Sequence, residues 1–275
     1  MTESKLIFLD IDGTLLKQDK TVPESAYRAI ELAQANGHKI FINTGRAISD
    51  ILPVIKTINY DGIICSNGTY VEIDGEVIFQ QNLSNEHVNE TLNWLNDNGV
   101  EYYSECKAGI YASENFIPRI AEIHMGGDTS ENREIMIKNN PKLILGENTY
   151  RDDVFKICFV CPEHITMDDM NEQFDKEFQI YPWSIGDYCS YFGELSQKGY
   201  TKANAMARVM EHYGAKLEDT IAFGDGPNDM EMIQFCGTGV AMGNATEDLK
   251  QVADLVTKPI TEDGIYHGFE VLELI

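Results

Sequence analysis

Short apolar segments alternate with helix-like segments at both ends of the chain, and this alternation restricts the fold more than any other feature. In the first part, apolar runs at residues 5–10, 38–43 and 62–65 are separated by segments with helical spacing. Near the other end, apolar runs recur at 220–223 and 238–242, again with helix-like text between them. Strands that alternate with helices form a parallel sheet covered by helices. The sequence therefore predicts an α/β fold with a Rossmann-like parallel-sheet core built from both ends of the chain.

Between these two parts the alternation stops. Asn67-Gly68 and Asp74-Gly75 are hairpin signals, and they flank a segment with strand character. From about residue 83 to 190, helices and short strands follow one another without regular repetition. A chain of 275 residues is long enough for two domains. We therefore expect a discontinuous core domain at 1–82 and 191–275 and an inserted α+β domain at 83–190.

The formal net charge of -24 disfavours several classes of partner. A field of this sign repels nucleic acid and anionic membrane surfaces. We see no secretion signal at the N-terminus, and the apolar runs are too short to cross a bilayer. The cysteines are scattered as reduced thiols are, and Cys158 and Cys161 have no second pair at zinc spacing. We expect a cytoplasmic monomer or weak homodimer that binds neither nucleic acid nor membrane.

The first acidic motif, Asp10-Ile11-Asp12-Gly13-Thr14, directly follows the first apolar run. Strand geometry turns Asp10 and Asp12 to one face, and Gly13 lets the backbone come close to a ligand. Two carboxylates this close require either a raised pKa or a cation between them. Taken alone, a solvated turn explains the motif equally well. A calcium loop does not, because Gly13 stands at the fourth rather than the sixth position and Thr21 occupies the twelfth.

The second acidic motif, Gly224-Asp225-Gly226-Pro227-Asn228-Asp229, follows the apolar run at 220–223. In isolation, an ordinary glycine-rich turn explains it as well as a functional site does. Open α/β sheets, however, bind ligands at the carboxyl ends of their strands, where both motifs are expected to lie. The carboxylates of Asp10, Asp12, Asp225 and Asp229 then converge. Oxygen ligands without a histidine cluster indicate Mg²⁺ rather than zinc or copper.

Two further residues are candidates for binding an anion. Thr44 follows the second apolar run, where a hydroxyl and free N–H groups can hold a phosphate oxygen. The alternative is that Thr44 simply caps the N-terminus of a helix. This alternative is favoured when Thr44 is considered on its own. Lys202 begins a helix, where the helix dipole disfavours a cation unless an anion lies nearby. Lys198 is a weaker candidate for the same task, and an isolated lysine here would be expected to face solvent.

Together these motifs resemble the haloacid dehalogenase superfamily, and within it the Cof-type branch (subfamily IIB), whose α/β cap is inserted after the third strand. Each motif is weak alone, but the ordered set is highly specific and covers nearly all of the predicted core. The inserted domain resembles the branch only in size and placement. The matching motifs are D-I-D-G-T at 10–14, N-T-G-R at 43–46, S-N-G at 66–68, T-K at 201–202, G-D-G-P-N-D at 224–229, G-V-A-M-G-N-A at 239–245 and D-G-I-Y-H-G at 263–268.

The resemblance implies a role for each catalytic candidate. Asp10 is expected to be the nucleophile, and Asp12 the general acid and then the general base. Thr44 and Lys202 are expected to bind the phosphoryl oxygens. Lys202 is preferred to Lys198 because it stands at the interval before the second acidic motif that the branch usually shows. The small glycine that usually follows this lysine is replaced here by Ala203-Asn204.

The resemblance also implies a metal site and a substrate site. Mg²⁺ would be held by Asp10, by the main-chain carbonyl of Asp12 and by Asp225, with Asp229 supporting the metal and Lys202. Arg46 is open to two interpretations, a substrate contact or an ordinary ion pair. The other candidates for contact with phosphate or substrate are Gly13, Gly45 and Asn228.

The implied activity is that of a Mg²⁺-dependent phosphatase acting on a small phosphorylated metabolite, such as a sugar phosphate, through an aspartyl-phosphate on Asp10. Asp12 favours phosphate chemistry, because a dehalogenase would have little use for a second aspartate. A phosphomutase of the same fold is one alternative. A non-catalytic module that binds a phosphorylated metabolite is another. The inserted domain is expected to determine substrate specificity, and the sequence leaves the substrate open.

Overall fold

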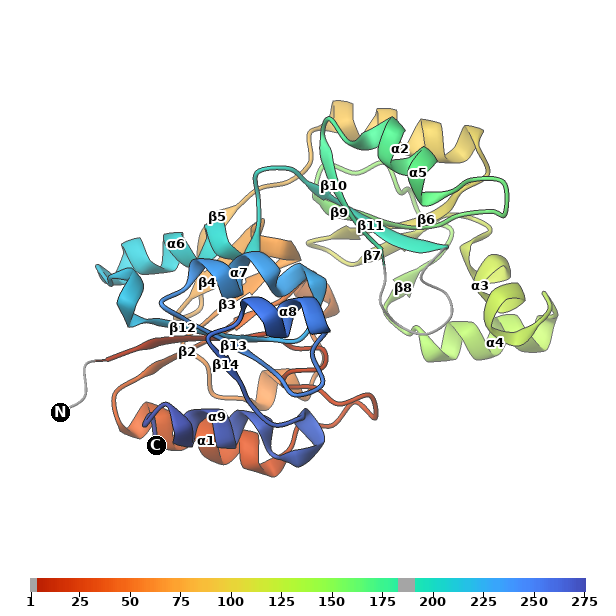
Figure 1. Ribbon diagram of the computed structural model, residues 1–275. Coiled ribbons are helices and arrows are strands. Elements are labelled where there is room, and N and C mark those ends of the chain that lie inside the picture. Colours follow the sequence, from red (N-terminus) through yellow and green to blue (C-terminus); the bar gives the residue numbers. More distant parts are fainter. Residues whose placement is uncertain (1–3, 183–190) are drawn as a thin grey trace. The chain divides into compact units, whose positions relative to one another are not determined.

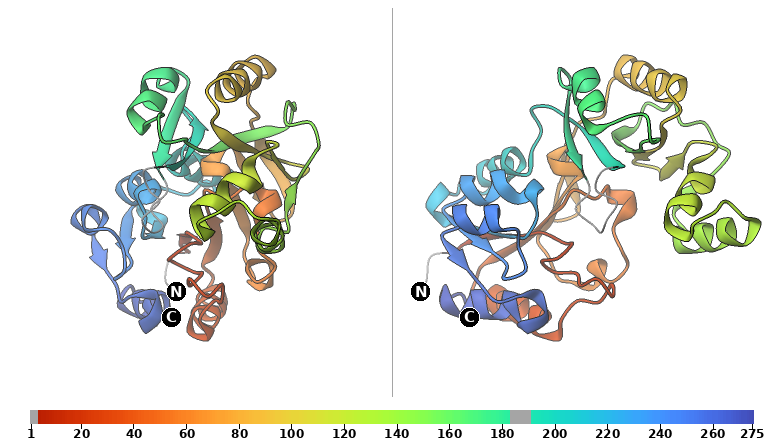
Figure 2. Two further views of the ribbon diagram at one scale, coloured as in Figure 1. Left: turned by 90° about the vertical axis from the view of Figure 1, so that its right-hand side faces the viewer. Right: turned by 45° about the vertical axis from the view of Figure 1, so that its right-hand side comes forward.

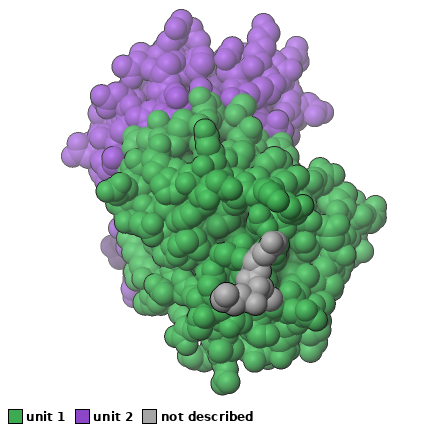
Figure 3. Space-filling view, turned by 90° about the vertical axis from the view of Figure 1, so that its left-hand side faces the viewer, with its two compact units in different colours: residues 1–46, 51–80, 199–275 green, residues 47–50, 81–198 purple. Residues whose placement is uncertain are grey.

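The computed structural model describes residues 4–182 and 191–275, and the chain divides into two compact units. Unit 1 comprises Met1–Arg46, Ile51–Gln80 and Gly199–Ile275, and unit 2 comprises Ala47–Asp50 and Gln81–Lys198 (Figure 3). The sequence placed the boundaries at 82/83 and 190/191, whereas the compact units change over at 80/81 and 198/199. The four residues 47–50 were not expected to belong to the second unit.

Unit 1 contains an eight-stranded sheet in the order β14-β13-β12-β1-β2-β3-β4-β5 (Figure 1). The strands from β14 to β3 pair in parallel, and β4 and β5 continue the sheet in antiparallel pairing. The predicted α/β fold with a parallel-sheet core is therefore confirmed. The strand bounds are β1 (Leu6–Leu9), β2 (Lys39–Asn43), β3 (Gly62–Cys65), β4 (Tyr70–Ile73), β5 (Glu76–Gln80), β12 (Thr220–Gly224), β13 (Thr238–Ala241) and β14 (Leu255–Val256).

Helices cover both faces of this sheet. On one face α1 and α9 lie side by side, and α6, α7 and α8 cover the other (Figures 1 and 2). Because both faces are covered, the central strands consist of continuous apolar runs rather than alternating ones. The helix bounds are α1 (Glu24–Ala35), α6 (Lys202–Tyr213), α7 (Met230–Phe235), α8 (Glu247–Val252) and α9 (Gly264–Val271), with short 3₁₀ helices at Ile55–Thr57, Ser66–Gly68, Leu217–Asp219, Pro227–Asp229 and Ile260–Glu262.

The segment between the apolar runs at 38–43 and 62–65 does not form the predicted α-helix. The chain makes only two 3₁₀ turns there, at Ile48–Asp50 and Ile55–Thr57. Pro53 lies between them and has no N–H to donate, so an α-helix cannot continue through this segment. The loop after β2 is therefore held by contacts with other segments and not by a helix of its own.

Unit 2 contains a six-stranded sheet in the order β10-β11-β9-β6-β7-β8. Neighbouring strands pair in antiparallel fashion, except for β7 and β8, which are parallel. Antiparallel pairing without β-α repetition explains why the predicted alternation stops in this part of the chain. The strand bounds are β6 (Glu101–Cys106), β7 (Ile110–Ala112), β8 (Leu143–Ile144), β9 (Val154–Val160), β10 (Phe178–Pro182) and β11 (Phe192–Gln197).

The helices of unit 2 build two apolar clusters on its sheet. Helices α2 (Asn85–Asp97) and α5 (Met167–Phe174) pack on β6, β9 and β11 through residues such as Leu92 and Phe174. Helices α3 (Phe116–Met125) and α4 (Ser130–Asn139) form the second cluster with Val160 and Phe192. Among the described residues, no helix of either unit is both long and apolar enough to span a membrane.

The segment just before β9 is irregular, and the strand begins at Val154. Arg151 forms an ion pair with Asp153 at 2.7 Å, and Asp153 also accepts a hydrogen bond from the N–H of Ala108. These side-chain contacts stabilise an irregular segment before the strand, which the apolar pattern alone did not indicate.

The central strand of unit 1 provides a test of the core. Phe8 on β1 is fully buried and stacks on Phe41 of β2 at 5.1 Å between ring centroids. Replacing Phe8 with alanine is expected to lower the free energy of unfolding by about 3–5 kcal/mol, because the change leaves a cavity. The exposed Val77 on β5 is the control, and Val77→Ala is expected to change stability by less than about 0.5 kcal/mol. Chemical denaturation measures both, and equal effects would contradict this description of the core.

Candidate active site

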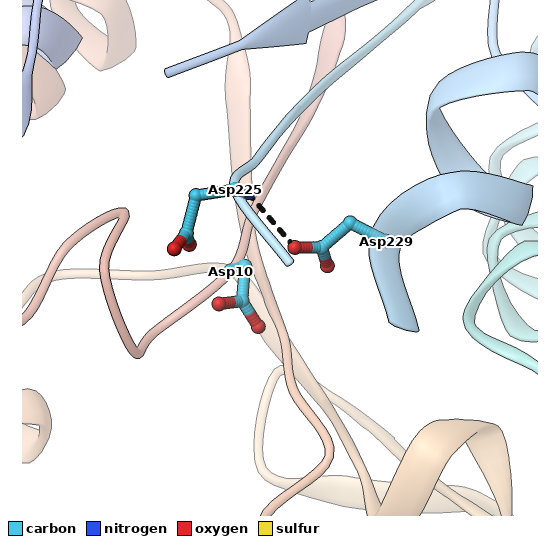
Figure 4. A group of neighbouring side chains, drawn as sticks. All are labelled: Asp10, Asp225 and Asp229. Carbon is cyan, nitrogen blue, oxygen red and sulfur yellow. Dashed lines mark hydrogen bonds between the residues drawn. The ribbon is translucent and has the colours of Figure 1, made fainter. Parts of the chain in front are cut away.

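Three carboxylates converge at the carboxyl ends of neighbouring strands. Asp10 follows β1 and Asp225 follows β12, and these strands pair in parallel with Leu9 opposite Phe223. Asp229 lies at the end of the 3₁₀ turn that precedes α7. One oxygen from each of the three side chains lies within 4.8 Å of the others (Figure 4). The topology thus brings together residues that are more than 200 positions apart in sequence.

Gly13 allows Asp225 to approach the first loop. Its φ of +86° lies in the left-handed region, and a Cβ atom at this position would lie 2.1 Å from Oδ2 of Asp225. Any larger residue would therefore displace the carboxylate. Thr14 donates a hydrogen bond from its hydroxyl to Oδ1 of Asp225 at 2.9 Å and fixes the orientation of the side chain.

Lys202 connects two of the three carboxylates. Its ammonium lies 2.6 Å from Oδ1 of Asp10 and 2.5 Å from Oδ1 of Asp229, and its side chain is 1% exposed. The other oxygen of Asp229 accepts hydrogen bonds from the N–H groups of Asp225 and Gly226, both at 2.9 Å. Asp229 therefore holds the Asp225 loop and Lys202 at the same time.

Lys202 occupies the start of α6 although no glycine follows it. Thr201 caps the helix by accepting a hydrogen bond from the N–H of Asn204 at 3.2 Å, so the Ala203-Asn204 sequence is compatible with a regular helix start. The alternative candidate, Lys198, is exposed and belongs to unit 2. The geometry therefore favours Lys202.

The charges of this cluster do not balance. Three carboxylates and one ammonium have a formal sum of -2, since three negative charges face one positive charge. Burial, together with the charge of Asp229, raises the pKa of Asp10 well above its ordinary value. Burial likewise raises the pKa of Asp225 to about 7. Burial opposes the charged form of Lys202, but Asp10 and Asp229 outweigh it and raise the pKa of the ammonium.

The donor set fits a hard divalent cation. It consists of three carboxylates and contains no histidine or cysteine, and a charge of +2 would balance its formal sum. The carboxylate of Asp12 is not one of the three. The metal role that the family resemblance implies for Asp12 concerns its main-chain carbonyl and stays a prediction.

Asp12 and Arg46 contact each other instead. Nε of Arg46 lies 2.6 Å from Oδ2 of Asp12, and Nη2 lies 2.8 Å from Oδ1. Both carboxylate oxygens are engaged in this fork, and the Asp12 side chain remains about half exposed, at 47%. The structure shows Arg46 in an ion pair, and its contact with a substrate stays a prediction.

Thr44 and Gly45 form a narrow loop after β2. Thr44 is buried, and its hydroxyl accepts a hydrogen bond from the N–H of Arg46 at 3.1 Å. A Cβ atom at Gly45 would lie 2.9 Å from Oδ1 of Asn67 and 3.3 Å from Nδ2 of Asn228. The predicted residue Asn228 thus lies against Gly45, together with Asn67, for which the sequence suggested no role.

Sequence reasoning did not single out three further residues of this region. Thr14 orients Asp225, and Asn43 donates a hydrogen bond to the carbonyl of Lys202 at 3.4 Å. Asn244 donates to the carbonyl of Gly13 at 2.9 Å and accepts from the N–H of Ile260. Each of the three residues lies within one of the recognised motifs, and the motif was the signal that could have identified it. Their partners, however, are far away in sequence.

Known proteins resemble this chain over nearly its whole length. It is 30% identical over 278 residues to the putative phosphatase YkrA of Bacillus subtilis, with 99% of each chain covered. It is 26% identical to the 5-amino-6-(5-phospho-D-ribitylamino)uracil phosphatase YitU of the same organism, with 96% of each covered. Among solved structures, the subclass IIB sugar phosphatase BT4131 matches with a TM-score of 0.79 and 30% identity, covering 99% of this chain and 100% of the other. The phosphatase BT1666 of Bacteroides thetaiotaomicron matches with a TM-score of 0.82 and 25% identity, covering 99% and 96%.

The family comparison agrees with the motifs. A family model described as haloacid dehalogenase-like hydrolase matches residues 7–269, which include every motif quoted above. The resemblance inferred from the ordered motifs is thereby confirmed. On this match and on the parallel-sheet fold that places Asp10 beside Asp225, the chain belongs to the haloacid dehalogenase-like hydrolases.

Proposed function

We propose that the chain is a Mg²⁺-dependent phosphatase that hydrolyses a monoester of a small phosphorylated metabolite through an aspartyl-phosphate on Asp10. The observation that carries this proposal is the buried contact of Lys202 with Asp10 and Asp229, beside Asp225. It sets an ionisable nucleophile, a fixed cation and a set of oxygen ligands within one small volume. The relatives that are named phosphatases support the reaction class.

The proposed reaction has two steps. In the first, the carboxylate of Asp10 attacks phosphorus, the bond to the leaving oxygen breaks, and Asp12 gives that oxygen a proton. In the second, Asp12 takes a proton from water, the water oxygen attacks phosphorus, and inorganic phosphate leaves Asp10. General acid and base catalysis of this kind contributes about 10²–10⁴-fold to a rate.

Arg46 places a condition on this use of Asp12. Both oxygens of Asp12 are held by the guanidinium of Arg46. Proton transfer to the leaving oxygen therefore requires that at least one oxygen of Asp12 exchange Arg46 for the substrate. The exposed position of Asp12 permits this exchange.

The remaining residues bind and neutralise the phosphoryl group. Lys202, the hydroxyl of Thr44 and the N–H of Gly45 are the proposed hydrogen-bond donors for its oxygens. Asp10 and Asp225, supported by Asp229, would hold Mg²⁺, which when bound supplies positive charge for the equatorial oxygens. Positioning and charge stabilisation are the main contributions that a protein makes to this kind of transfer.

We further propose that unit 2 corresponds to the predicted cap and selects the substrate, a sugar phosphate or a similar small metabolite. Its sheet contains a buried charged cluster formed by Glu105, Lys156 and Glu194. The ammonium of Lys156 lies 2.5 Å from Glu194 and 3.6 Å from Glu105. Apolar residues would usually stabilise a sheet at least as well as buried ion pairs do. Recognition of a hydroxyl-rich leaving group gives these charges a function.

The nucleophile can be tested with an isosteric change. Asp10→Asn is expected to reduce the hydrolysis of p-nitrophenyl phosphate by several orders of magnitude, because the amide cannot form the covalent intermediate. The exposed Asp19 is the matched control, and Asp19→Asn should retain the parental rate. Phosphate release in the presence of Mg²⁺ provides the measurement. An Asp10→Asn protein with the parental rate would rule out the nucleophile.

The raised pKa values predict how metal binding depends on pH. Asp225 has a pKa of about 7 in the folded protein against an ordinary value of 3.8, so the folded state binds more protons than the unfolded chain between these values. The metal-free protein therefore loses stability as pH rises through this window, and Asp10 contributes in the same direction. Mg²⁺ binds the ionised carboxylates.

We expect Mg²⁺ to raise the temperature of unfolding more at about pH 8 than at about pH 5.5, because protons compete for the carboxylates at the lower pH. Thermal unfolding with and without Mg²⁺ at the two pH values measures this difference. Asp225→Asn is the control, since it removes the shifted group and should reduce the effect of the metal at both pH values. A larger effect of Mg²⁺ at the lower pH would contradict the assignment.

Substrate selection by unit 2 can be tested with Glu194→Gln, which keeps the shape of the side chain and removes one charge. The variant is expected to change the order of kcat/KM values in a panel of phosphorylated sugars, polyols and nucleotides while p-nitrophenyl phosphate is hydrolysed as before. Asp153→Asn, which alters a different ion pair of unit 2, should leave the order unchanged. An unchanged order in the Glu194→Gln protein would argue against a role of the cluster in substrate selection.

The same assays separate the proposed phosphatase from a phosphomutase. Transfer of the phosphoryl group to a second sugar hydroxyl, instead of release of phosphate, would identify a mutase.

A further inference from the structure

The turn between β3 and β4 has an unusual backbone. Ser66, Asn67 and Gly68 have consecutive φ values of 49°, 52° and 98°, all in the left-handed region. Two of the three carry side chains, which disfavour this conformation. Both side chains are buried, and among the described residues the hydroxyl of Ser66 has no hydrogen-bond partner. Such a conformation persists only where the surrounding structure imposes it.

On one side the turn holds the Thr44 loop. The N–H of Asn67 donates to the carbonyl of Thr44 at 3.2 Å, and the N–H of Ser66 donates to the carbonyl of Arg46 at 2.8 Å. These bonds fix the main chain on both sides of Gly45. The side chain of Asn67 lies against Gly45 itself, since its Oδ1 atom would be 2.9 Å from a Cβ there.

On the other side the turn lies against the start of α6. A Cβ atom at Gly68 would lie 2.3 Å from the carbonyl oxygen of Thr201 and 3.2 Å from Cβ of Ala205. Thr201 caps the helix that begins with Lys202. The three residues of the turn thus fill the space between the Thr44 loop and the helix that carries Lys202.

We propose that the Ser66–Gly68 turn is a positioning element that sets the separation between the hydroxyl of Thr44 and the ammonium of Lys202. The inference rests on the proposed function, which assigns both groups to the oxygens of one phosphoryl group. These groups come from separate segments, the loop after β2 and the start of α6. Their separation therefore depends on what lies between these segments, together with the hydrogen bond from Asn43 to the carbonyl of Lys202. The left-handed backbone is what allows the turn to donate two hydrogen bonds on one side and to make close contact on the other.

The alternative explanation is that the turn is an ordinary hairpin connection whose backbone has no effect on the reaction. The two explanations are separated by a pair of matched glycines. Gly68 and Gly75 have φ values of 98° and 81°, and they lie in the turns before and after β4. A Cβ at Gly75 would meet no atom within 4 Å, whereas a Cβ at Gly68 would meet Thr201. Alanine is therefore strained at both positions but displaces α6 at only one.

Gly68→Ala is expected to lower kcat/KM for p-nitrophenyl phosphate by about 100-fold, the loss typical of a displacement of about 1 Å between reacting groups. The inhibition constant for inorganic phosphate should rise in parallel. Gly75→Ala should keep the parental kcat, KM and inhibition constant. If both variants keep the parental kinetics, or lose activity equally, the turn has no positioning role. If the parental protein releases no phosphate, the proposed function itself fails.

A second variant tests the proposal even if the Gly68→Ala protein does not fold. Asn67→Gly keeps the main-chain N–H, adopts the left-handed conformation without steric strain and removes the side chain beside Gly45. We expect an unchanged or higher unfolding temperature together with a lower kcat/KM. An ordinary hairpin would gain the same stability with unchanged kinetics, and that outcome would overturn the proposal.

Discussion

The buried contact of Lys202 with Asp10 and Asp229 is the interaction on which the rest of the site depends. A lysine that is 1% exposed is tolerated only when carboxylates compensate for the lost hydration. The two carboxylates belong to segments that follow β1 and β12, and the ammonium belongs to the start of α6. None of these charges can be buried alone, so the three segments must come together as the domain folds. Since apolar residues would serve stability at least as well, the arrangement is better explained by chemistry than by folding.

Much of this arrangement could be predicted because strand topology converts sequence order into position. Apolar runs before Asp10 and Asp225 indicated buried parallel strands, and the carboxyl ends of such strands share one edge of the sheet. The fork between Arg46 and Asp12 could not be predicted in the same way. Side-chain direction beyond the end of a strand depends on loop dihedrals, which the apolar pattern does not specify. The same limit applies to Thr14 and to the turn at Ser66–Gly68, whose partners lie on other loops.

Unit 2 was less predictable for a different physical reason. Its strands are mostly antiparallel, and its residues Lys156 and Glu105 stand in strands that are buried on both faces. Lys156 is the one charged residue in the otherwise apolar strand β9, and its burial is explained by charge pairs across the sheet. A cross-strand ion pair joins residues from separate strands, so no local window of the sequence contains it. The chemistry of the second unit could therefore not be predicted from the sequence.

The distribution of charge connects stability with metal binding. The chain has a formal charge of -24 and is proposed to bind an anionic substrate, so attraction must come from local groups. Lys202 supplies one positive charge, yet the surrounding carboxylates still exceed it by two. Because Gly13 has no side chain, Asp225 can approach the first loop, and its carboxylate contributes to this excess of negative charge. Burial, together with repulsion from neighbouring carboxylates, raises the pKa values of Asp10 and Asp225 and destabilises the metal-free site when these groups ionise. The proposed divalent cation would relieve that same repulsion, and the crowding that weakens the metal-free fold would therefore increase the affinity of the site for the cation.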